Sequence, residues 1–143
     1  MDIKVGILPE KEQILALYDD VGWTAYTDEP DLLMKALENS LNVWTIWEGE
    51  KLIGLARTIG DGATICYLQD ILITKSYQGR GLGSELLKEI LKANEEIPQF
   101  VLLTDDTEKT RRFYKKAGLS EVIDYSCLAF MKWVWFYVIR AAR

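Results

Sequence analysis

Three glycines at alternate positions form the part of this sequence most able to carry chemistry. Gly79, Gly81 and Gly83 lie between an apolar run that ends at Ile73 and an amphipathic segment that follows them. Glycine lets the backbone turn sharply and lets a ligand approach the amides without a Cβ in the way. The free N–H groups at a helix start, reinforced by the helix dipole, favour an anion, and Arg80 adds a positive charge beside them. The spacing therefore predicts a binding site for a phosphate or pyrophosphate group.

Three kinds of phosphate loop can be compared with this segment. A Walker loop needs Gly-Lys-Ser/Thr at its end, whereas Gly83 is followed directly by Ser84. A dinucleotide fingerprint needs its last glycine at the position of Ser84 and opens a βαβ unit, whereas this loop follows a run of adjacent strands. The pattern Q-x-x-G-x-G is met by Gln78, Gly81 and Gly83. We therefore favour the third kind, and a glycine-rich turn without a ligand stays open as the alternative.

The residue types that the chain lacks exclude several other kinds of site. It contains no histidine, which removes Ser-His and Cys-His nucleophilic sites and most zinc sites built from His and Cys. Its two cysteines, Cys66 and Cys127, form no CxxC pair, so a disulfide scaffold or a zinc ribbon is excluded. We expect no metal, and two free thiols in a reducing cytoplasm.

Length and charge limit the class of protein. A chain of 143 residues with 49% apolar residues can bury the core of one compact domain without disulfides, and we expect a single domain over residues 1–143. With 22 acidic and 17 basic side chains the net charge is −5, which argues against nucleic-acid binding and suits a cationic or neutral partner. The first eight residues do not resemble a signal peptide, and the apolar stretch over residues 127–139 is shorter than the ~20 residues that a membrane helix needs. A cytoplasmic protein with no membrane partner is expected.

Hydrophobic periodicity predicts the elements that must position the loop. A strand over residues 2–8 precedes two helices, at 9–21 and 30–40, and three strands that form an antiparallel meander, at 43–47, 52–59 and 64–73. After the glycines we expect a helix to about residue 95, a strand at 100–103, a helix at 107–117 and strands at 122–123 and 127–131. This order predicts an α+β domain with one strand–loop–helix crossover in its middle.

Two motifs at this spacing resemble those of a known superfamily. The segment Gln78-Gly-Arg-Gly-Leu-Gly83 resembles the acetyl-CoA loop of the GCN5-related N-acetyltransferases, the GNAT superfamily. The segment Arg112-Phe-Tyr-Lys-Lys-Ala-Gly-Leu119 resembles the later motif of that family, an aromatic pair on a helix that ends in glycine and a hydrophobic residue. The resemblance covers roughly residues 2–131. It implies a mixed, mostly antiparallel sheet with helices on both faces and a splayed central pair of parallel strands.

The resemblance also implies acetyl-CoA as the cosubstrate and indicates where it lies. The strand that ends at Ile73 would part from its parallel neighbour at 100–103, and its exposed backbone would pair with the pantetheine arm. Amides from Gly79 to Ser84 would hold the pyrophosphate, and Phe113 would pack against the cosubstrate. The expected cofactor-binding residues are Ile71, Leu72, Ile73, Gln78, Gly79, Arg80, Gly81, Leu82, Gly83, Ser84 and Phe113.

The same resemblance implies catalytic roles for two residues. Tyr114 matches the tyrosine that protonates the departing thiolate in many members, with a packed helix aromatic as the alternative. The thioester oxygen gains charge and needs a backbone N–H, for which we take that of Leu72. Where some members place a glutamate this chain has Tyr67, so Asp70 is the candidate general base; the alternative is a hydrogen-bonded carboxylate that orders the loop. The asparagine that many members carry before the tyrosine is Thr107 here.

The acceptor would lie beside the first two helices and their bend. Trp23, Tyr26 and Tyr67 are the candidate substrate-binding residues, although tryptophans in a small domain are also common in the core. Acidic residues around the bend would favour a cationic amine, or are simply solvated helix ends. We expect an N-acetyltransferase that moves the acetyl group of acetyl-CoA to a primary amine by direct attack in a ternary complex. A CoA-binding GNAT-like sensor or partner-binding module without turnover is the alternative.

The end of the chain lies outside this resemblance. Residues 133–139 are apolar on both faces if extended, and residues 133–143 form an apolar C-terminal extension. An exposed apolar patch of that size is typical of an interface. We therefore expect a homodimer in which residues after about Lys132 contact the partner. A strand that folds back over its own sheet and a partly disordered tail are the alternatives.

Overall fold

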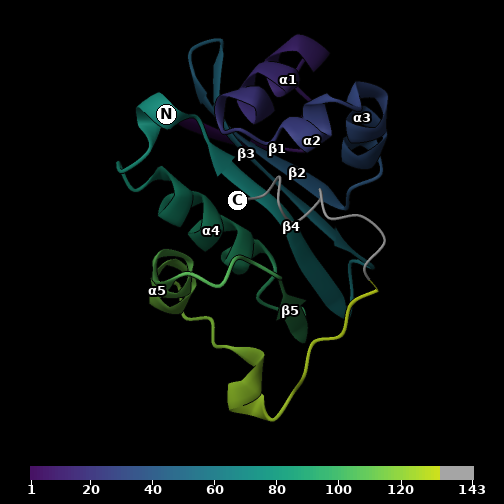
Figure 1. Ribbon diagram of the computed structural model, residues 1–143, viewed down its shortest axis with the longest axis vertical. Helices are drawn as coiled ribbons and strands as arrows, with labels where there is room; N and C mark the ends of the chain where they lie inside the picture. The colour runs from purple at the N-terminus through teal and green to yellow at the C-terminus, as the bar shows by residue number, and fades with distance from the viewer. Residues whose placement is uncertain (133–143) are drawn as a thin grey trace.

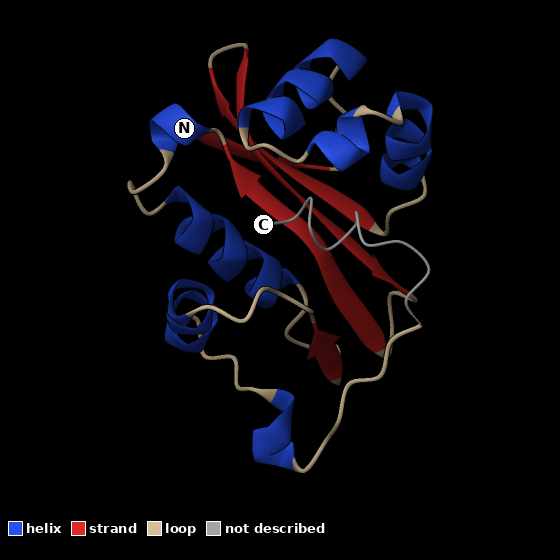
Figure 2. Cartoon of the chain, viewed as in Figure 1, coloured by secondary structure: helices blue, strands red, loops and turns tan. Residues whose placement is uncertain are grey.

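A five-stranded mixed sheet forms the centre of the protein. The computed structural model describes residues 1–132, and its sheet has the order β1-β2-β3-β4-β5 (Figures 1 and 2). Neighbouring strands pair in antiparallel fashion except β4 and β5, which are parallel. The strands span Asp2–Val5 (β1), Asn42–Glu48 (β2), Lys51–Gly60 (β3), Ile65–Ile73 (β4) and Gln99–Val101 (β5). This confirms the predicted α+β class and the predicted meander.

Helices cover both faces of the sheet. Figure 1 shows one layer formed by the first three helices and a second formed by α4 and α5. The α-helices span Lys11–Asp20 (α1), Thr24–Thr27 (α2), Pro30–Glu38 (α3), Leu82–Ala93 (α4) and Glu108–Lys116 (α5). Two short 3-10 helices span Lys75–Tyr77 (η1) and Val122–Tyr125 (η2). No helix among residues 1–132 is long and apolar enough to cross a membrane.

The core consists of one apolar cluster on each face of the sheet. On one face, Ile14 and Tyr18 of α1 pack with Leu33 and Leu37 of α3 against the sheet. On the other face, residues of α4 pack against β2, β3 and β4. Because β2 and β3 are covered on both faces, successive residues along each strand are buried, at 43–47 in β2 and 52–58 in β3. A ligand-binding site on this sheet must therefore lie at an edge of the region that the helices cover.

The ends of the N-terminal elements are set by local backbone chemistry. β1 stops at Val5 because Gly6 takes a left-handed conformation, with φ of +79°. The first helix begins at Lys11, two residues after the predicted start, and the Gln13 side chain accepts a hydrogen bond from the Glu10 amide just before it. The bend predicted between the first two helices contains the additional short helix α2.

The predicted strands at 122–123 and 127–131 are wrong. Residues Val122–Tyr125 form η2, and no strand follows them up to Lys132. Local turns satisfy this backbone, because the Ser126 amide bonds to Ile123 O and the Cys127 amide bonds to Val122 O. An apolar run becomes a strand only where a partner strand pairs with it, and within residues 1–132 β4 is the only partner of β5. The predicted tail contact after Lys132 lies outside the described residues.

Candidate active site

β4 parts from β5 soon after the two strands begin to pair. They pair only over residues 65–67 of β4. Directly afterwards Arg57 and Thr58 of β3, which are adjacent, lie opposite Asp70 and Leu68, so Gln69 is an extra residue in β4. Such a bulge bends its strand and interrupts regular pairing. β4 then continues to its end without β5 beside it, which is the expected splay of the parallel pair.

The free edge of β4 presents backbone groups from alternate residues. The Thr74 amide bonds to Ile53 O at 2.8 Å, and along an antiparallel pair the bonding direction alternates with each residue. Thr74 therefore bonds toward β3, and so does Leu72, two residues before it. The residues on either side of Leu72, Ile71 and Ile73, turn their N–H and C=O groups away from β3. The expectation that the Leu72 amide faces a ligand in the gap is therefore wrong. The amides of Ile71 and Ile73 face the gap instead.

The gap belongs to a cleft of about 640 Å³. It runs from the α1–α2 junction along β4 to the N-terminus of α4, with α5 and the segment after β5 on its other side. Most of the site residues predicted from the sequence line it: Trp23, Tyr67, Ile71, Leu72, Ile73, Gln78, Gly79, Gly81, Leu82, Gly83, Ser84, Phe113 and Tyr114. Three predicted residues do not line it: Tyr26, Asp70 and Arg80.

The glycine loop holds its backbone in a left-handed conformation at two positions. Gly79 and Gly81 have φ of +77° and +80°, and Gly81 is the N-cap of α4. A Cβ added at either glycine would meet no atom within 4 Å, so these residues serve backbone conformation and not close packing. The first amides of α4 have no acceptor within the helix, and such amides at a helix N-terminus bind phosphate well. The loop closes onto β4 because the Gln78 side chain donates to Ile73 O at 2.8 Å.

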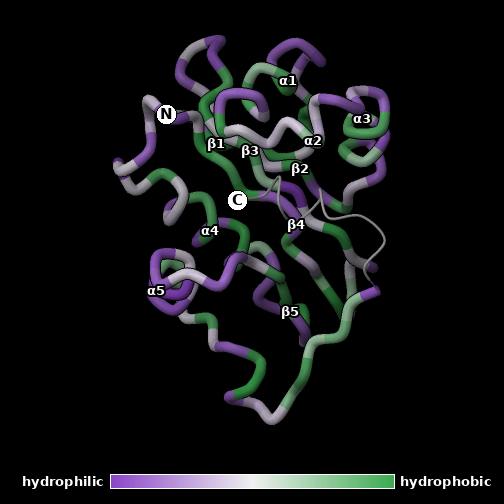
Figure 3. Tube along the Cα trace, viewed as in Figure 1, coloured by the Kyte–Doolittle hydropathy of each residue, from purple (hydrophilic) through white to green (hydrophobic). Residues whose placement is uncertain are grey.

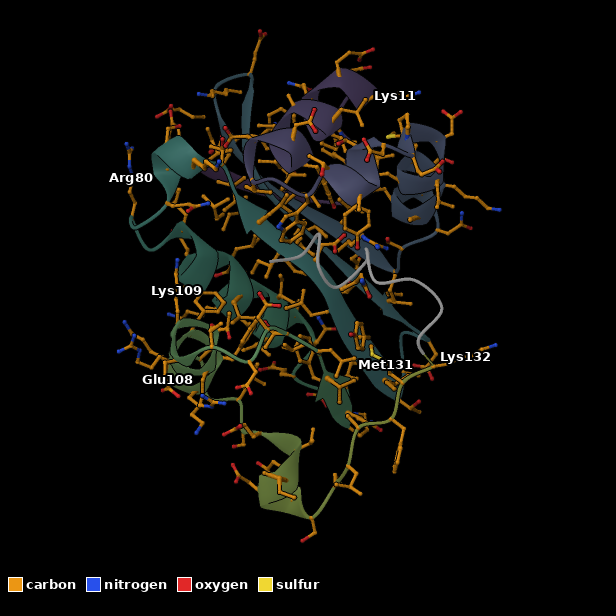
Figure 4. All side chains as sticks on the ribbon, in the orientation of Figure 1. Lys11, Arg80, Glu108, Lys109, Met131 and Lys132 are labelled. Carbon is orange, nitrogen blue, oxygen red and sulfur yellow. The ribbon has the colours of Figure 1, made fainter. Side chains whose placement is uncertain are left out.

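Arg80 points away from this loop. Its guanidinium lies over the ring of Tyr77, 4.6 Å from the ring centroid, and donates to Ser76 O at 3.1 Å. Figure 4 shows the Arg80 side chain at the outer edge of the molecule. Stacking on Tyr77 places the Arg80 side chain outside the cleft, whereas the sequence predicted that its charge lies beside the phosphate site.

Gly83 brings α4 close to α5. A Cβ built on Gly83 would lie 3.5 Å from the Phe113 ring, so a larger side chain would displace that ring. Phe113 also stacks edge-on against Tyr114, with 4.9 Å between the ring centroids. α5 starts at an N-cap formed by Thr107, whose side chain accepts from the Thr110 amide at 3.2 Å. The Thr107 side chain thus caps the N-terminus of α5.

Tyr114 and Tyr67 come from α5 and β4, on the two sides of the gap, and both line the cleft. Burial raises the pKa of Tyr114 to about 12, the Thr104 side chain opposes the rise, and Tyr67 adds to it. Burial also raises the pKa of Tyr67, whose hydroxyl accepts a hydrogen bond from the Leu103 amide at 3.2 Å. Both phenols are therefore protonated at neutral pH, as a proton donor must be.

Asp70 lies in the core beneath the cleft, only 1% exposed. Its Oδ2 accepts from Arg57 Nε at 2.5 Å and from the Tyr18 hydroxyl at 3.0 Å. Its Oδ1 accepts from the Tyr26 hydroxyl at 3.0 Å, and Gln69 donates to the same hydroxyl at 3.4 Å. Burial opposes the charge of Arg57, but the Asp70 carboxylate raises the pKa of that guanidinium. Asp70 thus ties α1 and α2 to β3 and β4.

Comparison with known proteins agrees with this geometry. Residues 39–119 match the family model of the acetyltransferase (GNAT) domain, which is more than half of the chain. The chain belongs to the GNAT family. Its fold matches that of a GNAT family acetyltransferase from Streptococcus pneumoniae with a TM-score of 0.81 and 35% identity, over 92% of this chain and 96% of that one.

Curated relatives are similar over part of their length. An uncharacterized N-acetyltransferase from Prochlorococcus marinus is 36% identical over 104 residues, which are 68% of this chain and 55% of that protein. A histone acetyltransferase from Glycine max is 30% identical over 116 residues, 72% of this chain and 48% of that protein. The chain thus spans about half the length of these two relatives.

Several cleft residues of this GNAT chain were not predicted from its sequence. Val21, Gln69 and Tyr77 line the cleft because the α1–α2 junction, the β4 bulge and η1 border it. Lys109, Arg112 and Lys116 line it from α5. Their spacing of three and four residues places them on one face of that helix, which is a signal the sequence does contain.

Proposed function

We propose that this protein is an acetyl-CoA-dependent N-acetyltransferase that acts on a primary amine by direct attack. The observation that carries this proposal is a single cleft in which the free backbone edge at Ile71 and Ile73 leads to the glycine loop at the N-terminus of α4. An extended amide-containing arm can pair with such an edge as a strand does. A pyrophosphate fits the loop amides. Both chemical features are present in acetyl-CoA.

The residues beside the gap provide what acyl transfer requires. Acetyl-CoA supplies an activated acetyl group as a thioester. The Ile71 amide would donate to the thioester oxygen as negative charge develops there. Tyr114, with its pKa raised to about 12, would protonate the departing thiolate. Holding the amine in line with the thioester supplies much of the remaining rate enhancement.

We assign Asp70 a positioning role in place of the general base. A base must reach the proton that it removes. The Asp70 oxygens instead accept hydrogen bonds from Arg57, Tyr18 and Tyr26, and the side chain is outside the cleft lining. A water chain along the polar groups of Tyr67 and Gln69 is our proposal for the route by which the ammonium loses its proton. An amine of ordinary pKa near ~10 loses that proton more readily as pH rises.

The acceptor end of the cleft is bordered by Trp23, Tyr67 and Gln69. We propose that the amine enters here, on the side of the α1–α2 junction. Asp19, Asp20 and Asp28 lie on or next to the helices of this junction and would attract a cationic amine. Asp20 is held toward the glycine loop, because its carboxylate accepts hydrogen bonds from the Thr74 hydroxyl and the Lys75 amide. These bonds also lower the pKa of Asp20.

Thiol release from acetyl-CoA in the presence of an amine panel tests the proposed activity. Panels of small amines, polyamines, aminoglycosides and peptides with free amines cover the open acceptor classes. Release that depends on both the amine and acetyl-CoA is the expected result. Tight CoA binding by calorimetry without release on any amine would instead support a sensor module. Absence of CoA binding would contradict the proposal altogether.

We also propose that the protein forms a homodimer through residues after about Lys132. The segment that leads to them exposes large apolar side chains: Leu128 is 71% exposed and Phe130 is 89% exposed. Figure 3 shows this approach to Lys132 coloured largely as hydrophobic. Light scattering should give a dimer mass for the full chain and a monomer mass for a chain that ends at Lys132. A full-length monomer, or a truncated chain that remains a dimer, would contradict this.

A further inference from the structure

The cationic side chains of α5 fall into two groups with different surroundings. Arg111 and Lys115 are neutralised by acidic residues. Arg111 bonds to Asp106 at 2.6 Å, to Glu108, and to Glu121 at 3.4 Å. Lys115 pairs with Glu121 at 3.1 Å.

The second group, which we call the α5 cationic face, consists of Lys109, Arg112 and Lys116. None of the three forms an ion pair with another residue in the described part of the chain, residues 1–132. All three line the cleft that contains the glycine loop. Asp105 is the acidic residue among those that line it.

The fold itself does not account for the α5 cationic face. No residue of α5 is fully buried, so these stems are not needed to fill the core. Like charges one helical turn apart repel each other and destabilise the helix. The chain also has an excess of acidic residues, with a net charge of −5, and yet no acidic residue among 1–132 forms an ion pair with any of these three. Their position against the cleft points to an anionic ligand.

The α5 cationic face lies next to the phosphate loop. Gly83, in the first turn of α4, approaches the Phe113 ring, and Arg112 is the neighbour of Phe113 in the chain. Figure 4 shows Lys109 on the same side of the molecule as the loop residue Arg80. Because Arg80 is stacked on Tyr77 outside the cleft, the cationic side chains that line the cleft within residues 1–132 all come from α5.

We propose that Lys109, Arg112 and Lys116 form a subsite for a second phosphate group, the 3′-phosphomonoester of coenzyme A. This inference rests on the proposed function. The loop amides suit the pyrophosphate, which is a diester-like group, whereas a phosphomonoester carries nearly two charges at neutral pH and favours charged donors. A guanidinium can bind such a group with two parallel hydrogen bonds, and lysines add point charges. The site therefore distinguishes coenzyme A from 3′-dephospho-coenzyme A.

Two double variants of the full-length chain test this subsite. Arg112→Gln/Lys116→Gln removes one arginine and one lysine from the α5 cationic face. Arg111→Gln/Lys115→Gln is the matched control, because it removes the same residue types at the same spacing from the paired group. Calorimetry measures the affinity of each protein for coenzyme A and for 3′-dephospho-coenzyme A, and circular dichroism checks that each variant is folded.

The wild-type protein should bind coenzyme A about 10-fold more tightly than the dephospho form, since several exposed charge pairs each contribute a few-fold. The first variant should lose most of this ratio while its affinity for the dephospho form stays within about two-fold. The control should keep the ratio. Raising the ionic strength to about 0.3 M should reduce the wild-type ratio, because salt screens exposed charges.

The outcomes separate this inference from the proposed function. Equal affinity of the wild type for the two compounds, or an equal loss for both in the first variant, overturns the subsite and leaves the proposed activity intact. A wild type that binds neither compound contradicts the proposed function itself. If the first variant proves unfolded, Lys109→Gln alone is measured, and an unchanged ratio in that variant and in Lys116→Gln overturns the subsite.

Discussion

The hydroxyl of Tyr26 donates a hydrogen bond of 3.0 Å to Oδ1 of Asp70, which connects α2 to the strand whose free edge borders the cleft. Tyr18 and Arg57 bond to the other carboxylate oxygen. The carboxylate thus fixes the acceptor side of the site relative to β4. Asp70 is 1% exposed and Arg57 is 7% exposed, so this ion pair has little contact with water. The pair should therefore be sensitive to the loss of either partner.

Replacement of Asp70 tests that sensitivity. Asp70→Asn leaves the Arg57 guanidinium buried without its counter-charge, and breaking a buried pair in this way costs about 3–5 kcal/mol of unfolding free energy. The control is Asp31→Asn, which removes the carboxylate of the exposed Lys11–Asp31 pair, whose side chains are 44% and 97% exposed. That change should cost no more than about 1 kcal/mol. Urea unfolding measures both, and similar losses for the two variants would contradict the structural role of Asp70.

Substitution in the glycine loop tests the phosphate site. Gly81→Asp places a side chain and a negative charge beside the α4 amides, and loss of charge-assisted hydrogen bonds to phosphate should weaken coenzyme A binding about 100-fold. Gly6→Asp is the matched control, because Gly6 has φ of +79° against +80° for Gly81 and an added Cβ meets no atom within 4 Å at either. Both variants should bear similar backbone strain. Unchanged affinity in folded Gly81→Asp would remove the loop from the site.

The sequence allowed prediction of features that depend on local spacing. The glycine loop, the start of α4 and the aromatic pair of α5 each occupy a short segment with a characteristic pattern. The positions of Gly81 and Phe113 could therefore be assigned to one cleft by resemblance to the GNAT family. The meander could be predicted as well, because its turns are short and contain glycine.

Features that depend on contacts between distant segments could not be predicted. The direction of the Leu72 amide depends on its pairing with β3, which the alternation of side chains does not show. The position of Arg80 depends on its stacking with Tyr77. The apolar residues Val122 and Ile123 resembled a strand, but strand formation depends on a partner and not on composition. That Arg112, unlike Arg111 and Lys115, forms no ion pair within residues 1–132 depends on where the acidic residues near α5 lie in the fold.

Stability at high pH tests the buried phenols. The pKa values of Tyr26 and Tyr114 are raised from 10.0 to about 12 in the folded protein, chiefly by burial. Between these values the unfolded chain loses protons that the folded protein keeps, so the free energy of unfolding falls as pH rises from about 10 to about 12. Each tyrosine should contribute a slope of roughly 1.4 kcal/mol per pH unit. Tyr26→Phe should flatten the profile, whereas Tyr125→Phe, at an exposed position, should not.

Replacement of Tyr114 tests the proposed leaving-group acid. Tyr114→Phe keeps the ring that packs against Phe113 and removes only the hydroxyl. Because a general acid acts in the transition state, kcat should fall roughly 10- to 1000-fold while KM for acetyl-CoA changes little. Tyr67→Phe is the comparison, since that hydroxyl also lines the cleft but accepts a hydrogen bond from the Leu103 amide. The pKa of about 12 at Tyr114 also predicts that its deprotonation will not limit kcat in steady-state assays below about pH 10. A Tyr114→Phe enzyme with the kcat of the wild type would mean that this tyrosine only packs between α5 and the cleft.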